Sequence, residues 1–139
     1  MRKRRLGRTG FEVSELSYGC GGTAGLMVRG SHQEQCEVVA SAIERGVNMF
    51  DTSPTYGGGH SETNLGKVLK TLGAAPIVST KIDFGPGDLD DLGQSIARSV
   101  RRSQERLNRD RLDVLYLHES YLSLGAICWA AFSRSSSGS

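Results

Sequence analysis

The stretch VNMFDTSPTY at residues 47–56 is an apolar run that ends in Asp51, with Tyr56 five residues later. Two later runs share this form, an apolar segment closed by a titratable side chain: IVSTK at 77–81, which ends in Lys81, and VLYLH at 114–118, which ends in His118. If the three runs are parallel strands of one curved sheet, all four polar side chains meet at one rim. That rim is where α/β barrels carry their chemistry. The pattern therefore predicts an α/β fold and locates a candidate site.

Helical patterns separate the predicted strands. Strands are expected at Leu16–Gly19, Val47–Asp51, Ile77–Ile82 and Leu112–His118, and helices at Ser31–Arg45, Ser61–Leu72 and Leu89–Leu107. Ser31 and Glu34 have the spacing of a capping box at the start of the first helix. Strands recur about every 30 residues with a helix in each interval, which is the βαβ rhythm of a parallel sheet with right-handed crossovers. Doubly wound sheets and barrels share this rhythm, so periodicity alone does not choose between them.

The two ends of the chain differ from this repeating part. The segment LGRTGFEV at 6–13 predicts a small hairpin with a Gly-containing turn. We expect one domain over residues 1–118 and a divergent tail over 119–139. The tail is apolar without clean periodicity at 121–132 and then Ser-rich, a composition typical of a disordered end. No fifth βα unit is visible in the sequence.

The composition argues against a nucleic-acid or membrane partner. The 139 residues carry a formal net charge of +2, and the basic cluster is confined to residues 2–5. This cluster is short and has no interleaved aromatic residues, so a solvated terminus is favoured over a nucleic-acid or membrane arm. No apolar stretch approaches the roughly 20 residues of a membrane helix. No N-terminal pattern of a signal peptide is present.

The cysteines favour a reduced, cytoplasmic setting. Cys20, Cys36 and Cys128 are odd in number, widely spaced and without metal-ligand spacing, so no metal site is expected. Cys36 lies on the apolar stripe of the helix predicted at 31–45. A small buried hydrophobe is therefore the favoured interpretation of that side chain.

The four rim residues suit proton transfer to an oxygen atom. A tyrosine hydroxyl is a poor acid at neutral pH, and a lysine ammonium beside it favours the phenolate. An aspartate paired with the lysine holds it in place, and a neutral histidine donates a hydrogen bond to a carbonyl oxygen. Together these groups fit the transfer of a proton to an oxygen that becomes negative as a hydride reaches carbon.

Five segments resemble the aldo-keto reductase family, in the family's own order. They are the opening hairpin at 6–14, the Asp-to-Tyr segment at 48–57, the second-helix segment SETNLGKVL at 61–69, the pair Thr80-Lys81, and LDVLYLH at 112–118. The similarity runs from about Arg4 to His118. It implies the N-terminal half of a parallel (β/α) barrel of the TIM type, incomplete, with the hairpin, about four strands and three helices.

This resemblance implies an NAD(P)H-dependent oxidoreductase that interconverts a small-molecule carbonyl and an alcohol. It implies a tetrad with one role for each member: Tyr56 as general acid/base, Lys81 as the cation that favours its phenolate, Asp51 as the partner of Lys81, and His118 as the group that orients the carbonyl. Three residues take the places that touch the nicotinamide of NADP(H) or NAD(H): Gly19, Cys20 and Asp51. The segment FDTSPTYGG at 50–58 is most similar in sequence to family members that oxidise free sugars such as galactose or arabinose.

Structural interpretations stay open beside the catalytic one. Taken singly, Asp51 suits a turn cap, Tyr56 a packed loop aromatic, Lys81 a solvated strand end and His118 a buried histidine. In the family, the groups that grip the cofactor's pyrophosphate come from later strands that this sequence does not show. The alternative to an enzyme is therefore a truncated, non-catalytic fragment, or a module that acts by association. The outer strands of a partial barrel would expose unpaired edges, so self-association is expected.

Overall fold

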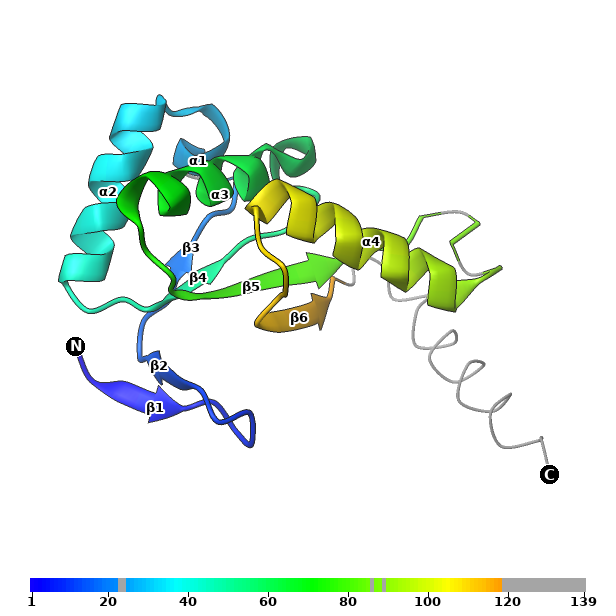
Figure 1. Ribbon diagram of the computed structural model, residues 1–139, viewed down its shortest axis with the longest axis horizontal. Coiled ribbons are helices and arrows are strands. Elements are labelled where there is room, and N and C mark those ends of the chain that lie inside the picture. The colour runs from blue at the N-terminus through cyan, green and yellow to red at the C-terminus, as the bar shows by residue number, and fades with distance from the viewer. Residues whose placement is uncertain (23–24, 86, 89, 119–139) are drawn as a thin grey trace.

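A four-stranded parallel sheet runs through the protein in the computed structural model, which describes residues 1–22, 25–85, 87–88 and 90–118 (Figure 1). Its strands lie side by side in the order β3 (Tyr18–Gly19), β4 (Met49–Asp51), β5 (Ile77–Ile82) and β6 (Val114–Leu117). Every neighbouring pair is parallel, which confirms the βαβ interpretation. The spatial order follows the chain order without reversal, as in a barrel and unlike a doubly wound sheet.

Helices fill the crossovers and lie together over one face of the sheet (Figure 1). They are α1 (Leu26–Arg29), α2 (His32–Glu44), α3 (His60–Leu72) and α4 (Leu92–Leu107), and a 3-10 turn, η1 (Tyr56–Gly59), precedes α3. The sequence predicts three helices, and the short α1 is an addition. The buried Gln35 side chain secures its end, because its amide nitrogen donates to the carbonyl of Leu26 at 2.9 Å and to that of Gly30 at 3.0 Å. A single turn is too short to show helical periodicity in the sequence.

Local signals set the helix ends. The predicted capping box is present at α2, where the Ser31 hydroxyl accepts from the Glu34 amide at 3.3 Å and the Ser31 amide donates to the Glu34 carboxylate at 2.9 Å. Gly73 ends α3 in a left-handed conformation with φ of 60°. Helix α4 begins at Leu92 rather than at residue 89, since the Asp91 side chain caps it. Residue 89 itself lies outside the described residues.

A hairpin at the N-terminus consists of β1 (Lys3–Arg5) and β2 (Glu12–Ser14), which pair antiparallel. The sequence predicts this hairpin, but its first strand begins earlier than expected and lies within the basic cluster. The guanidinium groups of Arg2 and Arg4 lie 3.0 and 2.8 Å from the carboxylate of Glu15. The cluster is therefore part of a strand with its own counter-charge, and its side chains stay exposed, as predicted for a solvated segment.

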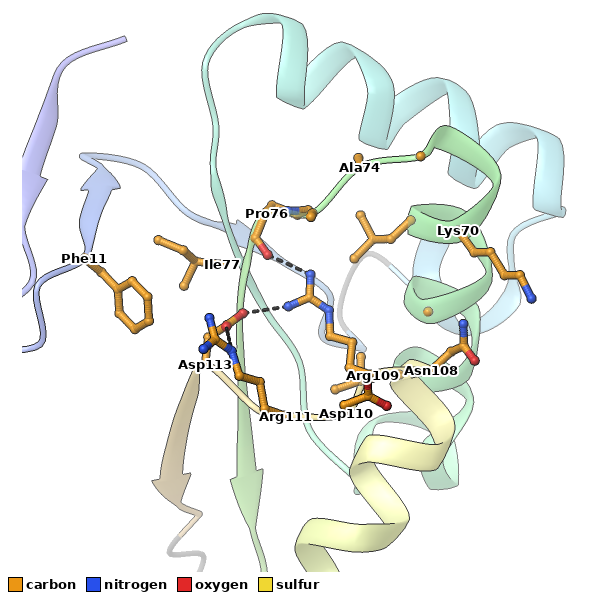
Figure 2. Close-up of a pocket in the computed structure, with 15 residues that line it drawn as sticks. Phe11, Lys70, Ala74, Pro76, Ile77, Asn108, Arg109, Asp110, Arg111 and Asp113 are labelled. Carbon is orange, nitrogen blue, oxygen red and sulfur yellow. Dashed lines mark hydrogen bonds and ion pairs between the residues drawn. The ribbon is translucent and has the colours of Figure 1, made fainter.

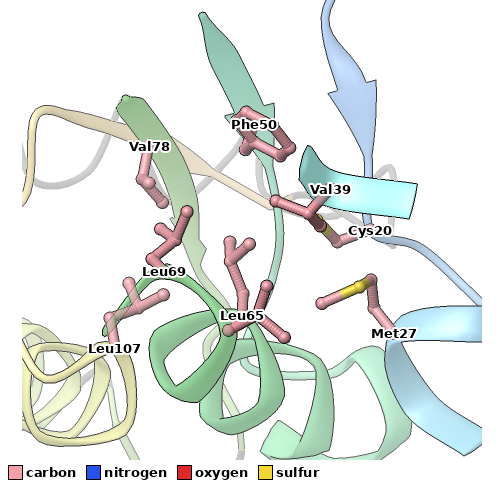
Figure 3. Close-up of a cluster of buried hydrophobic side chains, with 9 residues drawn as sticks. Cys20, Met27, Val39, Phe50, Leu65, Leu69, Val78 and Leu107 are labelled. Atoms are coloured by element: carbon pink, nitrogen blue, oxygen red, sulfur yellow. The ribbon is translucent and has the colours of Figure 1, made fainter. Parts of the chain in front are cut away.

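The hydrophobic core lies between the sheet and the helices (Figure 3). Its buried members come from β4 and β5, from all four helices and from the residue after β3: Cys20, Met27, Val39, Phe50, Leu65, Val68, Leu69, Val78 and Leu107. The apolar residues of α4 are only partly buried. Leu107 is buried, whereas Ile96 and Val100 are half-buried and the small polar Ser95 and Ser103 are buried instead.

Strand β6 is the last strand of the described sheet, and its outer edge has no partner strand among the described residues. Leu115, Tyr116 and Leu117 are exposed by 39%, 43% and 46%. Within the described part of the chain, no helix has the length and apolar character needed to cross a membrane. The predicted tail over 119–139 lies outside the described residues, and the boundary after residue 118 stays a prediction.

Candidate active site

The sheet brings the four predicted site residues to one rim. Asp51 is the last residue of β4, Lys81 lies one residue before the end of β5, and His118 follows β6 directly. Tyr56 begins the 3-10 turn η1 after β4. Because neighbouring strands are parallel and in sequential order, their carboxyl ends meet, and the four side chains are neighbours in space although 67 positions separate the first from the last.

Two residues of β5 hold both oxygens of the Asp51 carboxylate. The Lys81 ammonium donates to Oδ2 at 2.7 Å, and the buried Ser79 hydroxyl donates to Oδ1 at 2.8 Å. Ser79 and Lys81 are two positions apart, so their side chains emerge on the same face of the strand. Lys81 also donates to the carbonyl of Thr52 at 2.8 Å, and only 13% of its side chain is exposed. The ammonium is thus fixed by a carboxylate and a carbonyl oxygen rather than solvated at a strand end.

The Tyr56 ring lies against two other members of the tetrad, Lys81 and His118. The Lys81 ammonium is 4.9 Å from the ring centroid, and the centroid of the His118 ring is 5.9 Å away at an interplanar angle of 89°. On another side the ring approaches Gly21, where a Cβ atom would lie 3.4 Å from the aromatic carbons. The tyrosine is therefore packed between a cation, an imidazole and a close stretch of main chain.

His118 is held from two directions. Its backbone amide donates to the carbonyl of Ile82 at 2.7 Å, which continues the β5–β6 pairing past the end of the strand. Its ring nitrogen Nδ1 lies 3.2 Å from the hydroxyl oxygen of Ser53 and 3.4 Å from that of Thr55. Sequence reasoning missed Ser53, Thr55 and Ser79 as members of the site, since isolated Ser and Thr residues carry no motif of their own.

The predicted cofactor contacts Gly19 and Cys20 differ in how far they are exposed. Gly19 is exposed and pairs with Asp51 across β3 and β4, with no atom within 4 Å of the position that a Cβ would take. The Cys20 thiol is 1% exposed within the core, and burial, with a smaller contribution from the Asp51 charge, raises its pKa to about 12. Cys20 therefore presents its main chain near the rim, and its thiol stays neutral below strongly alkaline pH.

A cavity of about 690 Å³ lies at the opposite, amino-terminal end of β5 and β6 (Figure 2). Arg109 lines this cavity, and its guanidinium group donates to the Asp113 carboxylate at 2.6 Å and to the carbonyl of Pro76 at 2.7 Å. Asp113 in turn accepts from the Val78 amide at 3.0 Å. These contacts join α4 to the strand starts, and the cavity has no tetrad residue in its lining.

The amino-acid sequence matches the model of the "Aldo/keto reductase family" over residues 15–124. The chain belongs to the aldo/keto reductase family. The match covers the sheet, the helices and all four rim residues, so the resemblance in the sequence is confirmed. The (β/α) barrel type of fold follows with it.

Curated relatives with different names are about equally similar to the chain. L-galactose dehydrogenase of Arabidopsis thaliana is 35% identical over 119 residues, which are 84% of this chain and 37% of the relative. A protein named "Probable voltage-gated potassium channel subunit beta" from Oryza sativa subsp. japonica is 35% identical over 124 residues, 85% of this chain and 37% of the relative. This aldo/keto reductase chain thus spans well under half the length of these relatives.

Solved aldo-keto reductases share the fold. The holo form of an aldo-keto reductase from Bacillus halodurans superposes with a TM-score of 0.69 at 29% identity, over 88% of this chain and 42% of that one. An aldo-keto reductase from Klebsiella pneumoniae in complex with NADPH superposes with a TM-score of 0.64 at 20% identity, over 91% of this chain and 43% of that one. The four-stranded sheet therefore corresponds to part of the fold of these longer aldo-keto reductases.

Proposed function

We propose that this protein is an NAD(P)H-dependent oxidoreductase that interconverts a carbonyl compound and an alcohol. The observation that carries the proposal is the position of the Lys81 ammonium, 2.7 Å from the Asp51 carboxylate and 4.9 Å from the centroid of the Tyr56 ring. We propose that this cation stabilises the negative charge that forms on the tyrosine oxygen as its proton leaves. In this role Tyr56 exchanges a proton with a substrate oxygen.

Each tetrad residue has a part in this chemistry. Tyr56 gives its hydroxyl proton to the carbonyl oxygen during reduction, and takes a proton from the alcohol in the reverse direction. Lys81 stabilises the phenolate that remains, and Asp51 keeps the ammonium from turning away. His118 donates a hydrogen bond to the same substrate oxygen and orients the carbonyl, so that charge developing on that oxygen meets two polar groups.

We propose that the rim holds the nicotinamide end of a cofactor. The exposed Gly19 leaves an open surface at the end of β3, and the Asp51 carboxylate, whose side chain is 30% exposed, offers an acceptor beside it. A bound NADPH supplies the hydride that reaches the carbonyl carbon. We propose Gly19, Asp51 and the main chain of Cys20 as its contacts, and parallel titrations with NADPH and NADH decide between NADP(H) and NAD(H).

A sugar is the substrate class that we propose. The amino-acid sequence of residues 50–58 and the 35% identity to an L-galactose dehydrogenase both favour a free aldose such as galactose as the alcohol that is oxidised. The channel-subunit relative is equally similar, so the proposal of catalysis rests on the tetrad geometry and not on identity. A reduced, cytoplasmic setting, favoured by the cysteines, stays a prediction.

We also propose that the outer edge of β6 mediates self-association. Three consecutive apolar side chains are exposed there on a strand with an unpaired edge among the described residues. Such an edge is a template for pairing with another strand. This association module is the alternative function if the tetrad proves inactive.

The test is a pair of measurements on the chain and on its Tyr56→Phe variant. Calorimetric titration with NADPH reports cofactor binding, and the loss of NADPH absorbance with simple aldehydes, or its gain with galactose and NADP, reports turnover. We expect saturable binding by both proteins and turnover only by the native one. Turnover that survives in Tyr56→Phe, or no binding at millimolar NADPH by either protein, would contradict the proposed function.

A further inference from the structure

A pair of hydroxyl groups surrounds one nitrogen of the His118 ring. The Ser53 hydroxyl oxygen lies 3.2 Å from Nδ1 and the Thr55 hydroxyl oxygen 3.4 Å from it, and the two oxygens are 2.9 Å apart. Ser53 is fully buried and Thr55 is exposed. Both residues precede Tyr56 in the same turn, so one short segment contacts two members of the tetrad.

The turn has a fixed shape that keeps these hydroxyls in place. The Thr55 amide donates to the Ser53 hydroxyl at 3.3 Å, and the Tyr56 amide donates to the Ser53 carbonyl at 3.2 Å. Pro54 lies between the two hydroxyl residues and restricts the backbone there. The Nδ1 edge of His118 therefore faces a preformed polar wall, which leaves Nε2 as the ring nitrogen available to a substrate.

Two arrangements of protons satisfy the buried Ser53 hydroxyl. In one, the hydroxyl of Ser53 or that of Thr55 donates to Nδ1, so that the neutral imidazole carries its proton on Nε2. In the other, Nδ1 carries the proton and donates to Ser53, and Nε2 is left as an acceptor. Only the first arrangement lets His118 donate a hydrogen bond to a carbonyl oxygen.

We propose that Ser53 and Thr55 are positioning residues that hold neutral His118 in the tautomer with its proton on Nε2. This inference rests on the proposed function, because His118 needs a proton on Nε2 in order to donate a hydrogen bond to a substrate carbonyl. It goes beyond the tetrad because it assigns a role to two hydroxyls outside it. Hydroxyl donation to Nδ1 stabilises the Nε2–H form and fixes the plane of the ring at the same time.

The experiment is long-range ¹H–¹⁵N NMR of the histidine side chains in the full chain, at a pH where the rings are neutral. The chemical shifts of Nδ1 and Nε2 distinguish the two tautomers. Three histidines are present, and separate substitutions of His32 and of His60 by Gln identify the signals of His118 by elimination. We expect the Nε2–H tautomer to predominate at His118 in the native protein.

The Ser53→Ala/Thr55→Val double variant should shift His118 toward a mixture of tautomers, with the signals of the other two histidines unchanged. Thr55→Val alone is the safer variant, since Thr55 is exposed, and it should give a smaller shift in the same direction. Ser99→Ala on α4 is the matched control and should leave His118 as in the native protein. A native ring that is mainly Nδ1–H, or a tautomer that both variants leave unchanged, would overturn the inference.

This measurement needs neither cofactor nor turnover, so its failure and that of the proposed function are separate results. If the chain turns over, Ser53→Ala should lower kcat by roughly tenfold, about the effect of one hydrogen bond, with NADPH affinity unchanged. A variant that instead weakened NADPH binding and left kcat intact would contradict a positioning role.

Discussion

Removal of the Arg106 side chain should destabilise the fold far more than removal of any exposed arginine of α4. Glu62 on α3 is fully buried, and its carboxylate accepts from Arg106 at 2.6 Å and from the Thr80 hydroxyl at 2.6 Å. The three groups lie on α3, α4 and β5, so this buried carboxylate joins two helices to the sheet. Arg106→Ala leaves the charge of Glu62 with one neutral hydrogen bond and no counter-ion.

The size of the effect follows from this loss. Removing one partner of a buried ion pair costs about 3–5 kcal/mol, and the 27% exposure of the Arg106 side chain places this pair at the lower end, about 3 kcal/mol. With a urea m-value of about 2 kcal/mol/M, the unfolding midpoint should fall by about 1.5 M. The exposed Arg101 on the same helix is the matched control, and Arg101→Ala should change the free energy of unfolding by less than about 0.5 kcal/mol.

Urea unfolding followed by far-ultraviolet circular dichroism measures both variants. A third variant, Glu62→Gln/Arg106→Met, removes both charges and should recover part of the loss, because no uncompensated charge then remains. If Arg106→Ala costs no more than Arg101→Ala, the Glu62 carboxylate does not depend on its ion pair. The docking of α4 on α3 would then have to rest on apolar packing alone, which contradicts the role assigned to Arg106.

Gly66→Ala should destabilise the fold by about 2 kcal/mol, because the added Cβ would lie 2.7 Å from the α4 backbone. Gly93→Ala adds a Cβ in ordinary van der Waals contact only, so it should stabilise α4 by about 0.5 kcal/mol. Thermal unfolding of both variants measures these effects. Alkylation at pH 8 should label the half-buried Cys36 in the folded chain, and the Cys20 thiol, with its pKa raised to about 12, only after unfolding; peptide mass mapping that found Cys20 labelled early would contradict its burial. Tyr116→Lys on the β6 edge should shift the chain toward monomer in analytical ultracentrifugation, and a native chain that is already monomeric would remove the proposed self-association.

Strand and helix identities are readable from the sequence because each rests on local chemistry. The strand β5 has the predicted bounds, and the Ser31–Glu34 capping box lies where its spacing predicts. The basic cluster at 2–5 is exposed, as the sequence predicts, but the sequence does not predict the strand that it forms, because that strand depends on pairing with β2 and on Glu15 rather than on its own residues. A run of basic residues does not indicate which carboxylate, distant in sequence, will pair with it in the fold.

Arg106 shows the same limit inside a helix. Along the sequence it belongs to a row of arginines that is typical of a solvated face. In the fold it differs from the others because α3 brings the buried Glu62 against that position. The distinction between a solvated and a paired arginine is thus a property of helix packing, which periodicity within one helix does not contain.

The supports of the tetrad are unreadable in the sequence for a related reason, and they make the site depend on sheet register. Asp51 pairs directly with Ser79 in β4 and β5, and that pairing places the Ser79 hydroxyl on one carboxylate oxygen and Lys81, two residues on, at the other. A slip of one residue would turn both side chains to the opposite face of the sheet. Asp51 would then lose both donors at once, and Lys81 would leave the Tyr56 ring. The geometry of the tetrad is therefore stable only as long as the register is, so variants that loosen the β4–β5 pairing should lose the site before they lose the helices.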